Sequence, residues 1–161
     1  MESGGSTWAR GAPGSRDRGG LFTQPDPAPF PRHRILIVDD QIDVAHTEAL
    51  LLSQLGQTVQ CAYDGSSALA IAADFRPDIV LLDLDMPGMD GFETARQLRR
   101  VAAMRGARVI AHTGFARPEY RTATDAAGFD GFFVKPLRLA DVIKVLKEAP
   151  PAMGEPGAAA P

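Results

Sequence analysis

The chain has 161 residues and a formal net charge of −3, a length that suits one domain and excludes a large multidomain enzyme. This charge balance creates no strong field to attract nucleic acid or an acidic membrane surface, and the single cysteine excludes an internal disulfide or a cysteine-rich metal site. No apolar run approaches the roughly 20 residues of a membrane span, and the N-terminus lacks the apolar stretch of a secretory signal, so we expect a cytoplasmic protein without membrane contacts.

Proline and glycine are concentrated at the two ends of the chain. Such segments bury too little apolar surface to offset the entropy of the chain. We therefore predict a disordered Pro/Gly-rich arm over 1–33, one folded domain over 34–148 and a disordered Ala/Pro tail over 149–161. A domain of the central size buries roughly two-thirds of its unfolded-chain surface, which is enough for it to fold alone.

Short apolar runs alternate with helical stripes along the central domain. The pattern predicts, in chain order, a strand at Ile35–Val38, a helix at Val44–Leu55, a strand at Thr58–Ala62, a helix at Ser66–Phe75, a strand at Asp78–Leu82, a helix at Phe92–Met104, a strand at Arg108–His112, a helix at Glu119–Ala127, a strand at Phe132–Val134 and a helix at Leu139–Glu148. Strict alternation indicates parallel strands with helices on both faces. We therefore predict an α/β fold, a doubly wound five-stranded parallel sheet of order 2-1-3-4-5 with five helices, whose ligands lie at the carboxyl ends of the strands.

Side chains that can carry chemistry stand at those strand ends: Asp39 and Asp40 after the first strand, Asp83 after the third, Thr113 after the fourth and Lys135 after the fifth. Clustered carboxylates repel one another unless a cation neutralises them, and oxygen ligands without histidine or cysteine suit Mg²⁺. The lysine and the hydroxyl suit phosphoryl oxygens. Since a carboxylate can itself be a nucleophile, the residues predict a Mg²⁺-assisted aspartyl-phosphate site with Asp83 as the acceptor.

Four separated motifs occur in one order along the chain: Val38-Asp39-Asp40, Leu82-Asp83-Leu84-Asp85-Met86-Pro87-Gly88-Met89-Asp90-Gly91, Thr113-Gly114 and Lys135-Pro136. Together they resemble the receiver domain of bacterial two-component response regulators, over 34–148. The resemblance implies a flavodoxin-like receiver fold and a stand-alone signalling domain that is not a turnover enzyme. It also implies phosphoryl transfer from a histidine kinase or a histidine phosphotransfer protein, and output through protein–protein contacts without direct DNA binding.

The resemblance assigns roles at the acidic end of the site. It implies that Asp83 is the phosphoacceptor and that Mg²⁺ is held by Asp40 directly, by Asp39 largely through water, by Asp83, and by the backbone carbonyl of Asp85. The side chain of Asp85 places a further carboxylate beside the site, at a position that influences phosphate lifetime in this family.

The same resemblance implies a switch. Thr113 is expected to swing toward the phosphoryl group, Lys135 to pair with that group, and Pro136 to shape the lysine loop through a cis bond. Phe132 occupies the switch aromatic position, and its rotation would remodel the face of the fourth helix, fifth strand and fifth helix, where a downstream protein binds. The motif Thr113-Gly114-Phe115 is more similar to receivers attached to hybrid histidine kinases than to typical DNA-binding regulators.

Three alternatives to a phosphate-dependent switch stay open at this point. The first is a phosphate shuttle that hands the phosphoryl group to another histidine. The second is a phosphatase, because Asp83-Leu84-Asp85 after an apolar strand resembles the nucleophile motif of haloacid-dehalogenase-type hydrolases, although Asp39-Asp40 precedes it here and Pro87 departs from that motif. The third is an interaction module that does not depend on phosphate, which the complete acidic and lysine set disfavours.

Overall fold

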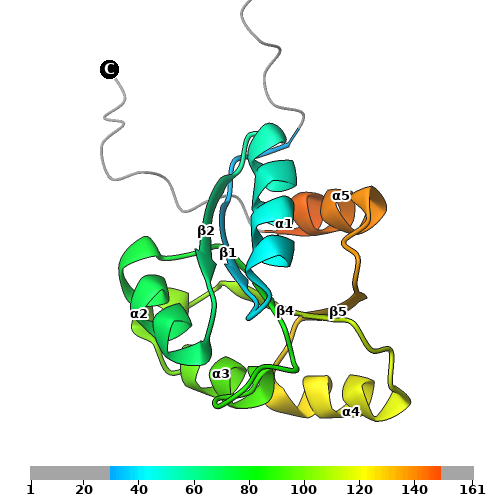
Figure 1. Ribbon diagram of the computed structural model, residues 1–161. Coiled ribbons are helices and arrows are strands. Elements are labelled where there is room, and N and C mark those ends of the chain that lie inside the picture. The colour runs from blue at the N-terminus through cyan, green and yellow to red at the C-terminus, as the bar shows by residue number, and fades with distance from the viewer. Residues whose placement is uncertain (1–29, 150–161) are drawn as a thin grey trace, which may run out of the picture.

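The computed structural model describes residues 30–149 and shows a central parallel sheet between two layers of helices (Figure 1). In chain order the elements are β1 (Arg34–Val38), α1 (Ile42–Gln54), β2 (Thr58–Ala62), α2 (Gly65–Phe75), β3 (Ile79–Leu82), α3 (Gly91–Leu98), the short 3₁₀ helix η1 (Ala102–Met104), β4 (Arg108–Thr113), α4 (Pro118–Ala127), β5 (Gly131–Val134) and α5 (Leu139–Glu148). The strand order is β2-β1-β3-β4-β5 and every pair is parallel. The predicted fold class and topology are therefore confirmed.

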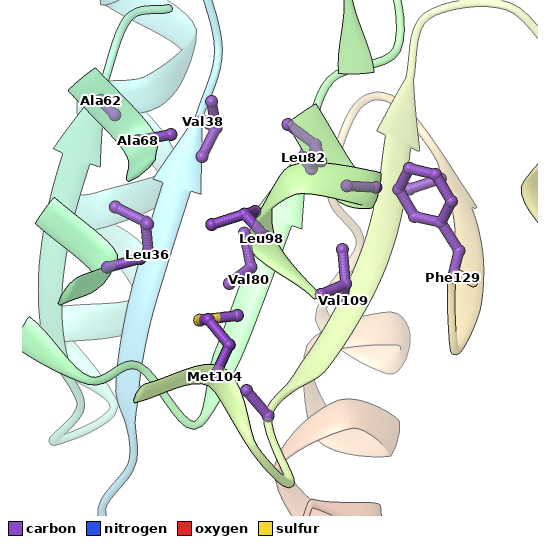
Figure 2. Close-up of a cluster of buried hydrophobic side chains, with 14 of the residues drawn as sticks. Leu36, Val38, Ala62, Ala68, Val80, Leu82, Leu98, Met104, Val109 and Phe129 are labelled. Carbon is purple, nitrogen blue, oxygen red and sulfur yellow. The ribbon is translucent and has the colours of Figure 1, made fainter. Parts of the chain in front are cut away.

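Two hydrophobic cores, one on each face of the sheet, hold the layers together. On one face Leu36 and Val80 pack with the inner sides of α2 and α3, and Figure 2 shows this cluster. On the other face Ile35 and Ile79 pack with α1 and α5. All four residues of β3 are buried, as expected for a central parallel strand covered on both faces.

The helix predicted over Phe92–Met104 is divided in the structure. The α3 helix ends at Leu98, and Val101 is extended before the 3₁₀ turn that inserts the buried Met104 into the core. Arg99, the residue after α3, donates hydrogen bonds to the carbonyl oxygens of Ala107 (2.8 Å) and Gly128 (2.7 Å). These bonds join the end of the helix to the segments before β4 and β5.

The residues that flank the predicted domain of 34–148 are also buried. His33 is 1% exposed, its backbone N–H donates to Oε1 of Gln57 at 2.8 Å, and Ala149 is 8% exposed. Residues 1–29 of the predicted arm and 150–161 of the predicted tail lie outside the described residues. Among the helices within 30–149, none combines the length and the apolar character needed to cross a membrane.

Candidate functional site

The acidic residues of the site stand in the loops that follow β1 and β3, two neighbouring strands of the sheet. The backbone N–H of Asp83 donates to the carbonyl of Val38 (2.9 Å), which continues the β1–β3 pairing one residue beyond β3. Asp39 and Asp83 are 1% and 4% exposed, and Asp40 is half-buried. One carboxylate oxygen from each of the three lies within 4.8 Å of the others, so residues 43 positions apart in sequence form one cluster because β1 and β3 are neighbours.

Lys135 brings a positive charge to this cluster from the loop after β5. Its Nζ lies 2.5 Å from Oδ2 of Asp39 and 3.2 Å from Oδ2 of Asp83, and the side chain is 14% exposed. The backbone N–H of Lys135 donates to the carbonyl of Thr113 (2.8 Å), and the bond to Pro136 is cis. Burial lowers the pKa of Lys135, but the hydrogen bond to Asp39 and the charge of Asp83 outweigh it, so the pKa is raised.

The carboxylate of Asp83 keeps a raised pKa despite this lysine. Burial is the largest cause that raises the pKa of Asp83, and the charge of Asp39 raises it further. Lys135 and the N–H of Asp85, which donates to Oδ1 of Asp83 at 3.3 Å, act in the opposite direction without cancelling the rise. A group of three carboxylates in which burial disfavours the ionised form is suited to a divalent cation with oxygen ligands. The donor set therefore fits Mg²⁺.

A second set of polar contacts joins β4 to α4 beside the cluster. Thr113, the last residue of β4, is fully buried, and its Oγ1 donates to Oδ2 of Asp85 at 3.3 Å. The other oxygen of Asp85, Oδ1, accepts a hydrogen bond of 2.8 Å from the hydroxyl of Tyr120 in α4. The hydrogen bond to Asp85 raises the pKa of Tyr120. The side chain of Asp85 thus lies beside the site, and it links Thr113 to α4.

Sequence reasoning did not find Tyr120 as a residue of this site. It lies 35 positions from Asp85 in sequence, and its place in the first turn of an amphipathic helix indicates only partial exposure. No spacing within the chain predicts that its hydroxyl reaches a loop on another strand.

Phe132 lies in β5 on the face covered by α4. It is partly buried, it packs against the core cluster on that face, and the guanidinium of Arg121 lies 5.6 Å from its ring centroid. Thr113 pairs with Val134 and Ala111 with Phe132 in the β4–β5 register. Since side chains two residues apart share a face of a strand, Thr113 and Phe132 both face α4.

His112, next to Thr113, belongs to the opposite face. It is 2% exposed, and its Nδ1 lies 3.4 Å from Oε2 of Glu48 in α1. Its Nε2 is buried, and no residue among 30–149 forms a hydrogen bond with it. The alternation of β4 therefore separates this histidine from the carboxylate cluster and leaves the cluster with oxygen ligands only.

Comparisons with known proteins agree with this geometry. The model of the response regulator receiver domain matches residues 35–147. Response regulator MprA of Mycobacterium ulcerans (strain Agy99) is 37% identical over 110 residues, which cover 68% of this chain and 47% of that protein. The chain spans between 13% and 47% of the length of three curated relatives.

Solved structures show the same fold. The chemotaxis protein CheY4 of Vibrio cholerae superposes with a TM-score of 0.67 at 31% identity, covering 72% of this chain and 97% of that one. The receiver domain of sensor histidine kinase PA1611 from Pseudomonas aeruginosa PAO1, solved with a magnesium ion coordinated in its active site cleft, gives a TM-score of 0.65 at 29% identity and covers 71% and 94% of the two chains. With the family model matching most of the chain, this protein belongs to the response regulator receiver family of two-component systems.

Proposed function

We propose that this protein is a stand-alone receiver that accepts a phosphoryl group on Asp83 from the phosphohistidine of a histidine kinase or a histidine phosphotransfer protein. The observation that carries the proposal is the cluster of Asp39, Asp40 and Asp83 with Lys135 at the carboxyl edge of the sheet. Receiver domains are signalling domains, and membership of that family supports the proposal.

Phosphoryl transfer depends mainly on the position of the reacting groups and on positive charge near the phosphoryl oxygens. A carboxylate oxygen of Asp83 attacks the phosphorus, the phosphorus–nitrogen bond breaks, and the imidazole leaves with the electron pair of that bond and takes up a proton. Nζ of Lys135, 3.2 Å from Asp83, is placed to balance the charge on the phosphoryl oxygens.

The cluster of Asp39, Asp40 and Asp83, with the backbone carbonyl of Asp85, would hold Mg²⁺. The ion supplies positive charge that offsets the charge of the phosphoryl oxygens. A cation would also stabilise the site before any phosphoryl group is present, because burial and the charge of Asp39 disfavour the ionised form of Asp83. Uptake of the phosphoryl group should therefore depend on the metal.

Phosphorylation would reach the surface through Thr113 and Phe132, which both face α4. The downstream protein is proposed to bind the face formed by α4, β5 and α5. A shuttle that passes the phosphoryl group to another histidine uses the same acceptor chemistry, and the lifetime of the phosphorylated state separates it from a switch. The phosphatase alternative predicts turnover of free phosphoesters, and this activity would distinguish it from a receiver.

The test is phosphoryl uptake from a small-molecule phosphodonor, read as intact mass with and without Mg²⁺. We expect one gain of about 80 Da that requires Mg²⁺ and disappears in Asp83→Asn, because the acceptor oxygen is then replaced by an amide. The matched control is Asp74→Asn, which removes an exposed carboxylate of α2 and should leave the gain unchanged. A gain that survives Asp83→Asn, or no gain in folded wild-type protein, contradicts the assignment of Asp83.

A further inference from the structure

The carboxylate of Asp85 accepts hydrogen bonds from two hydroxyl groups that belong to different elements. Thr113 Oγ1 donates to its Oδ2 at 3.3 Å from the end of β4, and the Tyr120 hydroxyl donates to its Oδ1 at 2.8 Å from the first turn of α4. Thr113 Oγ1 also accepts the backbone N–H of Phe115 at 3.3 Å. The threonine hydroxyl is therefore already engaged as a donor in the unphosphorylated protein.

This engagement competes with the phosphoryl group. A threonine hydroxyl carries one proton and can donate one hydrogen bond at a time. If Thr113 is to donate to a phosphoryl oxygen on Asp83, as the proposed function requires, it must first release Asp85. Every factor that strengthens the bond from Thr113 to Asp85 then weakens the affinity of the site for a phosphoryl group.

Tyr120 is the residue that can strengthen this bond. Asp85 is exposed, so without a second partner its carboxylate would turn freely into water and would hold Thr113 only weakly. The ring of Tyr120 is fixed in turn, because it packs edge-on against Phe92 of α3 with 5.9 Å between ring centroids, and the guanidinium of Arg117 lies 5.6 Å from its centroid. The tyrosine hydroxyl therefore stands at a defined point above the loop after β3.

We infer that Tyr120 is a positioning residue that holds the Asp85 carboxylate against Thr113 and so lowers the affinity of the unphosphorylated site for the phosphoryl group. The inference rests on the proposed function, because it concerns the hydroxyl that would bind the group on Asp83. It also gives α4 a direct connection to the site: when Thr113 leaves Asp85, the carboxylate keeps only its partner on α4.

The experiment measures the affinity of the full chain for beryllofluoride, a tetrahedral mimic of the phosphoryl group, by titration calorimetry in the presence of Mg²⁺. Tyr120→Phe removes the hydroxyl and keeps the ring that packs on Phe92. We expect it to bind roughly fivefold more tightly than wild type, the factor that corresponds to about 1 kcal/mol for one hydrogen bond. The control is Tyr63→Phe, which removes the only other tyrosine hydroxyl of the chain, one that contacts His46 at 2.7 Å, and should leave the affinity unchanged.

A double variant shows whether Tyr120 acts by positioning Asp85 against Thr113 or through a general effect on packing. Because Tyr120 is inferred to act through Thr113, Tyr120→Phe should leave the affinity unchanged when it is introduced into Thr113→Ala. Equal binding by Tyr120→Phe and wild type, weaker binding by Tyr120→Phe, or a gain that persists in Thr113→Ala would each overturn the inference. Failure of the proposed function gives a different result, since wild type itself would then not bind beryllofluoride, or Asp83→Asn would bind it equally well.

Discussion

The charge balance around Asp83 is the residue-scale feature on which the site depends. The carboxylate lies against Asp39 and Lys135, both largely buried, so three charges share a small volume with little water to screen them. Lysine alone does not restore the ordinary pKa of Asp83, which stays raised. Binding of a proton or a cation would therefore stabilise the site.

A dependence of stability on pH follows from the raised pKa of Asp83. The folded chain binds this proton more tightly than the unfolded chain does, so in metal-free buffer the free energy of unfolding falls as pH rises from the ordinary carboxyl pKa through the raised one. Asp83→Asn removes this loss. We expect the variant to be more stable than wild type at pH 7 and the difference to shrink as the pH is lowered below the ordinary carboxyl pKa, as measured by urea unfolding.

Magnesium provides the check on that prediction. Addition of Mg²⁺ should stabilise wild type more than Asp83→Asn, since the amide is a poorer ligand than the carboxylate, and should narrow the difference at pH 7. A variant that is less stable than wild type at pH 7 without metal would show that the contact between Lys135 and Asp83 outweighs the burial of Asp83.

The sequence predicted the residues of the acidic cluster because each stands at the end of an apolar strand, and parallel strands bring such ends together. It did not predict the side-chain contacts that lie around this cluster. Glu48 and His112 pair across the α1 face, and Tyr120 reaches Asp85, through side-chain packing between elements that have no fixed spacing in the chain. Residue types at strand ends are visible in a sequence, whereas rotamers and contacts across helices are not.

At the scale of the elements, the connection from β3 to α3 positions the acceptor. Gly91 begins α3, its N–H donates to the carbonyl of Leu84 at 3.1 Å, and Asp90 caps the helix with a 2.8 Å bond from the N–H of Glu93. A Cβ on Gly91 would lie 2.2 Å from the carbonyl oxygen of Asp83 and 2.7 Å from Cα of Leu84. The helix therefore begins against the backbone that carries Asp83, and only glycine fits there.

Gly91→Ala should accordingly affect both stability and the site. Backbone atoms cannot move aside as a flexible side chain can, so we expect the free energy of unfolding to fall by about 2 kcal/mol and phosphoryl uptake to slow as the loop that holds Asp83 shifts. Urea unfolding and the rate of mass gain from a phosphodonor measure the two effects. Gly114→Ala is the control, because a Cβ at Gly114 meets nothing within 4 Å. Unchanged stability in Gly91→Ala would contradict the close packing of α3 on the β3 loop.

The elements themselves were largely predictable, and the exception has a physical cause. Nine of the ten predicted elements occur at their places, most with small shifts at their ends, because continuous apolar runs and helical stripes follow burial directly. The long third helix was wrong in its second half, where Val101 is extended and a 3₁₀ turn places Met104 in the core. Arg99, just after α3, contacts carbonyl oxygens of distant segments. A helical stripe of residues gives no indication of such tertiary packing.

At the scale of the whole molecule, the described residues contain two complete cores. The cluster between the sheet and α2–α3 and the cluster between the sheet and α1–α5 draw their buried side chains from 35–149, with Phe30 packed at the margin of the second. His33 adds a hydrogen bond from its backbone to Gln57 and a contact of 3.3 Å between its Nε2 and the carbonyl of Leu146. These contacts show that His33, the residue before the predicted start of the domain, packs with the folded part of the chain.

Two shortened chains, one of residues 30–149 and one of residues 34–149, should differ in stability. A chain of residues 30–149 keeps the buried His33 and should unfold at the same urea concentration as the full chain and take up the phosphoryl group at the same rate, because both cores and the carboxylate cluster lie within it. A chain of 34–149 loses the bonds that His33 makes to Gln57 and Leu146 and should be less stable by about 2 kcal/mol, since two buried hydrogen bonds and the burial of one ring are removed. Equal stability of the two shorter chains would show that His33 contributes nothing to the fold, and a large loss in 30–149 would show that the terminal segments are part of the folding unit.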